Sequence, residues 1–295
     1  MKHLFVVNPV AGKGRALGFV ETIRIEAAVL TDDYEIVFTE YPGHATEIVK
    51  EHVGKEQCRV YSVGGDGTVN EIVNGLIGSS STLAVIPAGS GNDYLRSIYE
   101  DDVYESIVSR TIRGIEKPID VVKVNDRCCA NVSSMGLDAE AAYMANKIKH
   151  IPLIPGGLSY ILGLVVTLIK CKSYNMKITM DSEVIEGRML AVVVANGKYY
   201  GNKIMPAPRA DISDGILDIC LIRKKGRLEI LKLFPRYIKG KHEGLRGITF
   251  HRCNHVHIIS TDSVPINLDG EVTRIDEATF DILPGALQIV VPAEK

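Results

Sequence analysis

Three glycine-rich turns, each directly after an apolar run, contain the residues whose types and spacing favour chemistry. They are segments 8–14 (NPVAGKG), 64–71 (GGDGTVNE) and 88–93 (AGSGND). Glycine lets the backbone approach an anion closely, and the start of a following helix offers unpaired N–H groups with a partial positive charge. Because the carboxyl ends of parallel strands share one edge of a sheet, the turns together predict a polyphosphate site.

Polar side chains within these turns suit phosphate binding. Lys13 would add a full positive charge, and Thr68, Asn70 and Ser90 offer hydrogen bonds. Neither the Gly-x-x-x-x-Gly-Lys-Ser/Thr spacing of a P-loop nor a Gly-x-Gly-x-x-Gly fingerprint follows the first strand, so a nucleotide site of another kind is indicated. Asp66 has two interpretations that the residues leave open, a ligand for Mg²⁺ or a cap of the helix that starts near Thr68.

Two acidic segments lie in the second half of the chain. Asp269 and Glu271 are two residues apart, which sends both carboxylates to one side of an extended chain. The Asp-Gly pair between them is equally typical of a hairpin turn. Segment 211–218 (DISDGILD) is a second acidic cluster, and its Asp-Gly pair predicts a turn before the next strand.

The elements that must position these residues change in character along the chain. Four apolar runs alternate with three amphipathic stretches in the order 4–7, 16–30, 34–38, 45–52, 58–63, 69–77 and 82–86. This alternation predicts a parallel α/β layer. Later runs such as 189–195 and 217–222 are short and alternating, which predicts an antiparallel sheet. We expect two domains, 1–124 and 125–295, with the final strand, 286–291, returning to the first.

Composition excludes several classes of protein. The 295 residues are 46% hydrophobic and 24% charged, which are ordinary globular values. With 34 Lys and Arg against 36 Asp and Glu, no overall basic field attracts nucleic acid. The six cysteines include no C-x-x-C pair, so neither a zinc site nor a disulfide framework is indicated. The first apolar run, 4–7, is too short for a signal peptide, and we expect a cytoplasmic protein.

Segment 64–71 resembles the signature of the diacylglycerol kinase catalytic domain, which sphingosine, ceramide and, in shorter form, NAD kinases share. Further motifs of bacterial lipid kinases of this kind follow in order along nearly the whole chain: Asn8-Pro9 with Gly12-Lys13, Thr39 with Gly43-His44-Ala45, 87–93, Asn131 with 136–139, 208–218 and 268–271. The resemblance implies a Rossmann-like, NAD kinase-like α/β N-terminal domain and a mainly antiparallel β-sandwich. It implies a kinase that uses ATP and Mg²⁺ to phosphorylate a lipid hydroxyl, with diacylglycerol as the leading acceptor and phosphatidic acid as product.

The resemblance also implies roles for residues. ATP would lie on Asn8, Pro9, Val10, Ala11, Gly12, Thr39, Gly64, Gly65, Asp66, Gly67, Thr68, Val69, Asn70 and Ser90. Asp269 would be the general base, assisted by Glu271, which would orient it or bind metal, with Asp66 and Lys13 as further catalytic residues. A structural magnesium ion would be held by Asp211, Asp214 and the carbonyl of Ile216. Relatives carry three glycines where Gly201-Asn202-Lys203 stands here, so we expect this loop to differ in shape or ligand contact.

Features outside the nucleotide site bear on the acceptor. Segment 223–246 has nine Lys and Arg against two Glu, which predicts either a basic helix that settles on an anionic membrane or a helix packed on the sheet. The apolar region 151–169 would line an acyl-chain entrance or fill the core. We expect a lipid partner, no nucleic acid and a place at the inner membrane face; a homodimer is left open. The alternative functions are a soluble NAD kinase-type enzyme and a catalytically inactive nucleotide-binding regulator.

Overall fold

The computed structural model describes residues 1–30, 32–99, 106–148 and 172–294. Its N-terminal elements are β1 (Lys2–Val7), two short 3₁₀ turns (Ala11–Lys13 and Arg15–Phe19), α1 (Val20–Ala27), β2 (Tyr34–Phe38), α2 (His44–Val53), β3 (Cys58–Gly64), α3 (Asp66–Leu76), β4 (Thr82–Pro87), α4 (Asp93–Ile98), α5 (Ile107–Ile112) and β5 (Ile115–Val124).

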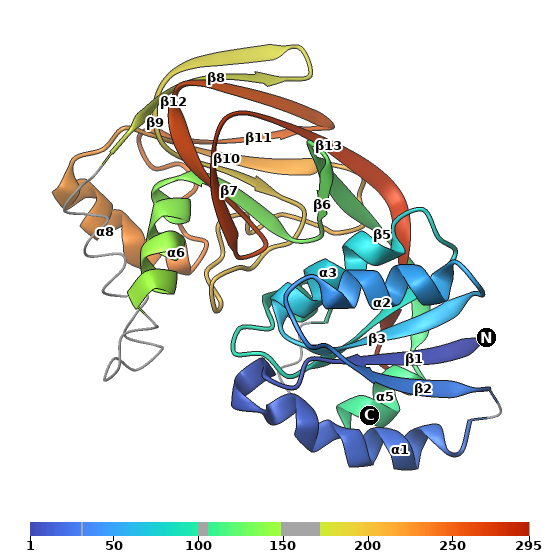
Figure 1. The fold of residues 1–295 in the computed structure, drawn as a ribbon. Helices are drawn as coiled ribbons and strands as arrows, with labels where there is room; N and C mark the ends of the chain where they lie inside the picture. The colour runs from blue at the N-terminus through green and yellow to red at the C-terminus, as the bar shows by residue number, and fades with distance from the viewer. Residues whose placement is uncertain (31, 100–105, 149–171, 295) are drawn as a thin grey trace.

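The first unit is an α/β layer, as the alternation of apolar runs predicts. Strands β2, β1, β3 and β4 are parallel and lie in this order. Helices α2 and α3 pack on one face and α1 and α5 on the other (Figure 1), which buries most of β1, β3 and β4 on both sides. The predicted helix over 16–30 is shorter in the structure, because residues 11–19 form 3₁₀ turns around Gly12 and Gly14, both at positive φ.

The second unit is built mainly from antiparallel strands. Its elements are β6 (Arg127–Cys129), β7 (Val132–Gly136), α6 (Leu137–Ile148), β8 (Tyr174–Met180), β9 (Glu183–Ala195), β10 (Leu217–Arg223), α8 (Arg227–Ile238), β11 (Ile248–Cys253), β12 (His255–Leu268) and β13 (Glu271–Val291). Apolar side chains from β5 to β10 and from β12 and β13 enclose one core, and α6 and α8 cover a second face of β9 and β10 (Figure 1). The two-unit arrangement with a sandwich-like second unit agrees with the sequence.

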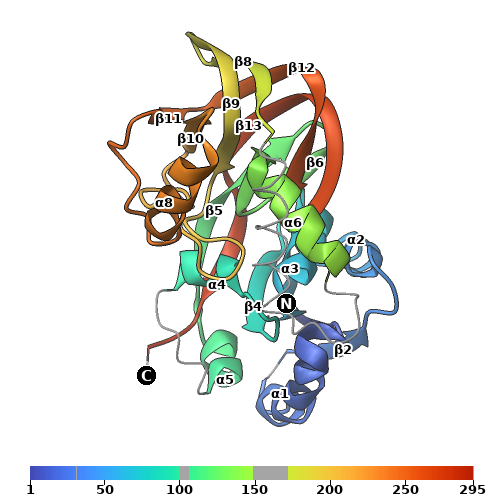
Figure 2. The same cartoon turned by 90° about the vertical axis from the view of Figure 1, so that its left-hand side faces the viewer.

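Strand β13 joins the two units. Its first part pairs with β12 in antiparallel register from Glu271 onward. Its last part pairs with β5, and Gln288 and Ile289 lie parallel to Thr82 and Leu83 of β4. A continuous sheet therefore runs from β11 to β2, and β13 passes from the second unit into the first (Figure 2).

Asp120 of β5 holds three segments together at this junction. The side chain is 2% exposed, and its carboxylate accepts the N–H of Gly215 at 2.6 Å and of Gly285 at 2.8 Å. Its own N–H donates to the carbonyl of Ile212 at 2.7 Å. Gly215 precedes β10 and Gly285 lies in the irregular middle of β13, so one buried carboxylate fixes segments that are far apart in sequence.

Replacement of Asp120 by Ala should destabilise the protein strongly. Two N–H groups would lose the buried, charged oxygen atoms that accept them, which costs about 2–4 kcal/mol of unfolding free energy. Urea unfolding followed by circular dichroism measures this loss. Asp126→Ala, at an exposed position in the next turn, is the matched control and should change stability by less than about 0.5 kcal/mol. Equal effects of the two variants would contradict the assignment.

Candidate active site

The first glycine turn contacts both of the others. Asn8 donates its side-chain N–H to Oγ1 of Thr68, 3.0 Å away in the second turn. Gly12 lies against the third turn so closely that a Cβ on it would be 2.0 Å from the carbonyl oxygen of Ala88. Because no side chain fits there, Gly12 is required by packing as well as by its positive φ of 58°.

The second and third turns meet at two further glycines. A Cβ on Gly89 would be 2.5 Å from the Cα of Gly65, so both backbones depend on the absence of a side chain. Arg15 donates from Nη1 to the carbonyl of Gly89 at 3.3 Å and brings a cation that the sequence analysis did not single out. The side chains of Lys13 and Ser90 are exposed beside this cluster. The three turns thus form one surface of backbone groups with positive charge at its edge.

Asp66 is the first residue of α3, which begins two residues before the predicted position. Its carboxylate accepts the N–H of Tyr94 at 3.0 Å, so it binds the start of α4 rather than its own helix. Burial, together with the charges of Asp93 and Asp269, raises the pKa of Asp66 to about 6, against the opposing effect of the Tyr94 N–H. Acidic groups of both units therefore influence one another across the junction.

Asp269 occupies the two-residue turn between β12 and β13. Asp269 (φ 46°) and Gly270 (φ 99°) are both left-handed, as in the hairpin turns that favour Asp-Gly. The carboxylate accepts the N–H groups of Ala130 at 2.9 Å and Val132 at 3.3 Å, and burial raises its pKa above the usual range although these N–H groups oppose the rise. Asn70 of α3, with its amide nitrogen facing the acceptors around it, donates to Asp269 Oδ2 at 3.3 Å.

Glu271 has a different partner. Its carboxylate lies 2.7 Å from Nη2 of Arg127, and both side chains are about half exposed, at 57% and 51%. The hairpin turn therefore directs Asp269 to buried N–H groups and Glu271 to a surface ion pair. The assistance that the family resemblance assigns to Glu271 stays a prediction.

The acidic loop before β10 is already neutralised in part by the protein. Asp211 accepts the N–H of Ser213 at 3.0 Å and its hydroxyl at 2.8 Å. Asp214 forms an ion pair with Arg252, whose Nε also lies 3.6 Å from Asp218. The predicted structural magnesium site stays a prediction, and a metal ion there would compete with Arg252 for Asp214.

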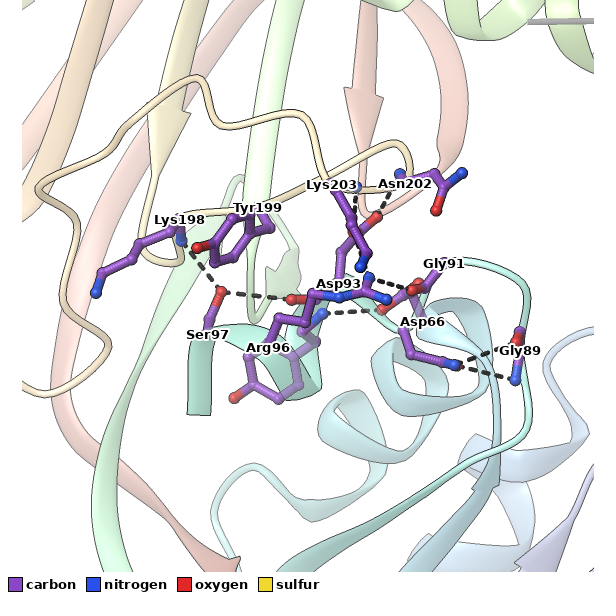
Figure 3. Close-up of polar contacts among 12 residues, drawn as sticks. Asp66, Gly89, Gly91, Asp93, Arg96, Ser97, Lys198, Tyr199, Asn202 and Lys203 are labelled. Atoms are coloured by element: carbon purple, nitrogen blue, oxygen red, sulfur yellow. Dashed lines mark hydrogen bonds and ion pairs between the residues drawn. The ribbon is translucent and has the colours of Figure 1, made fainter. Parts of the chain in front are cut away.

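The loop 197–203 connects the second unit to α4 (Figure 3). Asp93 accepts the N–H of Asn202 at 2.7 Å and of Lys203 at 2.8 Å, and Ser97 Oγ accepts the N–H of Lys198 at 3.1 Å. Asn202 and Lys203 have φ of 70° and 73°, which is unfavourable for residues with a side chain, so the Asp93 carboxylate holds a strained backbone in place. The sequence analysis gave Asp93 no role, because its partners lie more than 100 residues away.

Comparison with known proteins decides the family. Residues 2–124 match the family model of the diacylglycerol kinase catalytic domain, and residues 131–291 match that of the YegS C-terminal NAD kinase beta sandwich-like domain. The chain belongs to the diacylglycerol kinase-like family of lipid kinases. The resemblance found in the sequence is thereby confirmed.

Individual relatives of this diacylglycerol kinase-like chain cover most of its length. A diacylglycerol kinase of Bacillus subtilis (strain 168) is 29% identical over 86% of this chain and 84% of its own. One of Mycobacterium tuberculosis (strain ATCC 25618 / H37Rv) is 26% identical over 97% and 94%. The crystal structure of a diacylglycerol kinase from Bacillus anthracis str. Sterne aligns with a TM-score of 0.74 at 25% identity, covering 98% of this chain and 96% of that one.

Asp66→Asn should stabilise the metal-free protein, and more so at high pH. An acid whose pKa is raised by folding binds its proton more tightly in the folded state, so stability falls as the pH rises from about 4 to about 6. The shifted pKa of Asp66 then lowers the unfolding free energy by about 1.5 kcal/mol at pH 5, where the folded-state group is mostly protonated, and by about 3 kcal/mol at pH 8, where it is ionised. Melting temperatures in EDTA at the two pH values test this. If Asp66→Asn raises the melting temperature equally at pH 5 and pH 8, or does not raise it at all, the electrostatic interpretation is wrong.

Asp93→Asn should weaken the link between the two units. The amide has one acceptor oxygen for two N–H donors and no charge, and we expect kcat/KM for ATP to fall about 10- to 100-fold. Lys203→Gly in the Asp93→Asn background removes the side chain from a residue whose backbone is left-handed. This relieves the strain and should restore part of the lost kcat/KM. Ser97→Ala, which removes only one hydrogen bond to the loop, is the control with a smaller effect. Failure of Lys203→Gly to restore activity would show that backbone strain is not what Asp93 holds.

Proposed function

We propose that this diacylglycerol kinase-like chain transfers the γ-phosphate of ATP to the hydroxyl of diacylglycerol and forms phosphatidic acid. The observation that carries the proposal is the contact of Asp269, from the second unit, with Asn70 of the first, close enough to the glycine turn for the charge of Asp269 to raise the pKa of Asp66. A carboxylate beside a polyphosphate site is what transfer to a hydroxyl needs, because the hydroxyl must lose its proton.

We propose that the three joined turns bind the phosphates of ATP. Their backbone N–H groups and the start of α3 suit an anion, and Lys13 and Arg15 add cations at the rim. The other proposed contacts are segments 8–12 and 64–70, Thr39 and Ser90. Thr39 is 9% exposed at the end of β2, on the same edge of the sheet as the turns.

The residues at the junction fit a magnesium ion. Carboxylate oxygens are hard ligands, and the raised pKa of Asp66 shows a buried negative charge that a cation would relieve. Within the described ranges, no group of three or more His, Cys, Asp and Glu side chains could hold a metal by itself. Mg²⁺ commonly takes one or two carboxylates, here Asp66, with water and nucleotide oxygens as its other ligands. When bound, Mg²⁺ would neutralise charge on the phosphates.

We assign the base to Asp269. The proton of the acceptor hydroxyl passes to this carboxylate while the hydroxyl oxygen bonds to the γ-phosphorus and the bond to ADP breaks. Burial raises the pKa of Asp269, which makes it a stronger base, and the N–H groups of Ala130 and Val132 fix its direction.

A lipid acceptor has to be reached at a membrane surface. No helix in the described part of the chain is long and apolar enough to cross a bilayer. The acyl-chain entrance expected at 151–169 lies outside the described residues. We therefore propose peripheral contact with the inner membrane face, where the acceptor would enter between the two units.

Phosphate transfer from labelled ATP with Mg²⁺ tests the proposal. We expect label in an organic-extractable product when diacylglycerol is offered in mixed micelles, and a loss of at least about 1,000-fold in Asp269→Asn with ATP binding intact. Transfer to NAD would instead establish a soluble NAD kinase-type enzyme. ATP binding without transfer to any tested acceptor would favour an inactive regulator.

Glu271 has a matched control in its own ion-pair partner. If Glu271 only pairs with Arg127, then Glu271→Gln and Arg127→Gln should change transfer equally and by less than about threefold. A loss confined to Glu271→Gln would support the assisting role that the family resemblance assigns to it.

A further inference from the structure

Helix α8 is fixed to the second unit by its inner face. Ile230, Leu233 and Tyr237 are buried in the core over β9 and β10. The Tyr237 hydroxyl donates to Oδ2 of Asp138, the second residue of α6, at 2.6 Å. The burial of this inner face matches one of the two alternatives predicted for segment 223–246, a helix packed on the sheet. The opposite face of α8 is directed toward solvent.

The outer face of α8 carries an apolar stripe. Leu228 is 74% exposed and Leu231 is 56% exposed, and Pro235 is exposed as well. The spacing i, i+3 and i+7 aligns these three residues, which we call the outer stripe, along one side of the helix. Among the described residues, helix α8 is therefore apolar on two faces, and only its inner face packs against other elements.

Positive charge borders the outer stripe. Lys232, Arg236 and Lys239 are exposed and lie within about 80° of Leu228 on the helix circumference. Segment 223–246 contains two acidic residues, and each has a partner outside the outer stripe. Glu229 accepts the N–H of Gly226 at 2.8 Å, and Glu243 lies 2.7 Å from Arg209. An apolar stripe with cations along its edge is complementary to an anionic lipid surface.

We propose that the outer stripe inserts into an anionic bilayer and orients the enzyme on it, an inference that rests on the proposed function because the acceptor lies in that bilayer. Helices α8 and α6 are on the face of the molecule that also shows α4 (Figure 2). The Tyr200 hydroxyl is 3.3 Å from that of Tyr237, and Tyr200 belongs to the loop 197–203, whose N–H groups Asp93 binds. A bilayer on α8 thus lies beside the element that links the second unit to the phosphate turns.

A second copy of this chain fits the outer stripe less well. Stable protein interfaces bury about 800 Å² on each partner, far more than three side chains in a row provide. A two-fold contact would also place Lys232, Arg236 and Lys239 against the same cations of the other copy. Lipid headgroups of opposite charge remove that repulsion.

Flotation with vesicles tests the inference without relying on activity. We expect binding to vesicles of phosphatidylglycerol and phosphatidylcholine, with weaker binding to phosphatidylcholine alone. Leu228→Ser with Leu231→Ser should lower partitioning by about tenfold or more. The matched control is Ile25→Ser with Val29→Ser on and just after α1, at positions 62% and 74% exposed, which should change it by less than about twofold. Lys232→Gln with Arg236→Gln should reduce the salt dependence of binding.

Other outcomes separate this inference from the proposed kinase activity. On monomeric short-chain diacylglycerol, the Leu228 and Leu231 double variant should keep kcat within about twofold, because no surface is involved. If the wild-type protein binds vesicles but phosphorylates no lipid, and the double variant still loses vesicle binding, the proposed function fails and the inference about the outer stripe stands. Unchanged binding by the double variant, equal loss in the control, or a change of oligomeric state in light scattering would each overturn the inference.

Discussion

A single strand determines how the two parts of the candidate active site meet. Strand β13 starts directly after the turn that holds Asp269 and ends beside β4, whose following turn carries Gly89. Because β13 pairs with strands of both units, hydrogen-bonded register fixes how the hairpin turn of Asp269 is connected to the strands that precede the glycine-rich turns. Asp120 reinforces this register by binding the irregular middle of β13.

The junction concentrates negative charge that the apoprotein only partly compensates. Asp66 and Asp269 are both partly buried, and desolvation raises the pKa of each, which is an electrostatic cost to the folded state. Nearby backbone N–H groups reduce that cost without removing the charge. Neutral amides at these two positions would avoid this cost. The carboxylates that we propose for function are therefore the groups that lower the stability of the fold at this junction.

The sequence predicts features that depend on neighbouring residues. Glycine after an apolar strand is sufficient to place the three glycine-rich turns, and Asp-Gly is sufficient to predict the turn at Asp269. Features that depend on the pairing of distant strands cannot be predicted from local sequence. The partner of Glu271 is Arg127, and the partners of Asp93 are the N–H groups of residues 202 and 203, all more than 100 residues distant. No local pattern records such pairings, and only the assembled sheet shows them.

The return of β13 to β4 has a consequence for synthesis on the ribosome. Gln288 pairs with Thr82, more than 200 residues earlier in the chain. This edge of β4 therefore stays unpaired while the whole second unit is translated. At about 5–20 residues per second this delay is roughly 10–40 s. An unpaired edge can join a strand of another chain in that time. The same strand that fixes the active site therefore makes the nascent protein a natural client for chaperones.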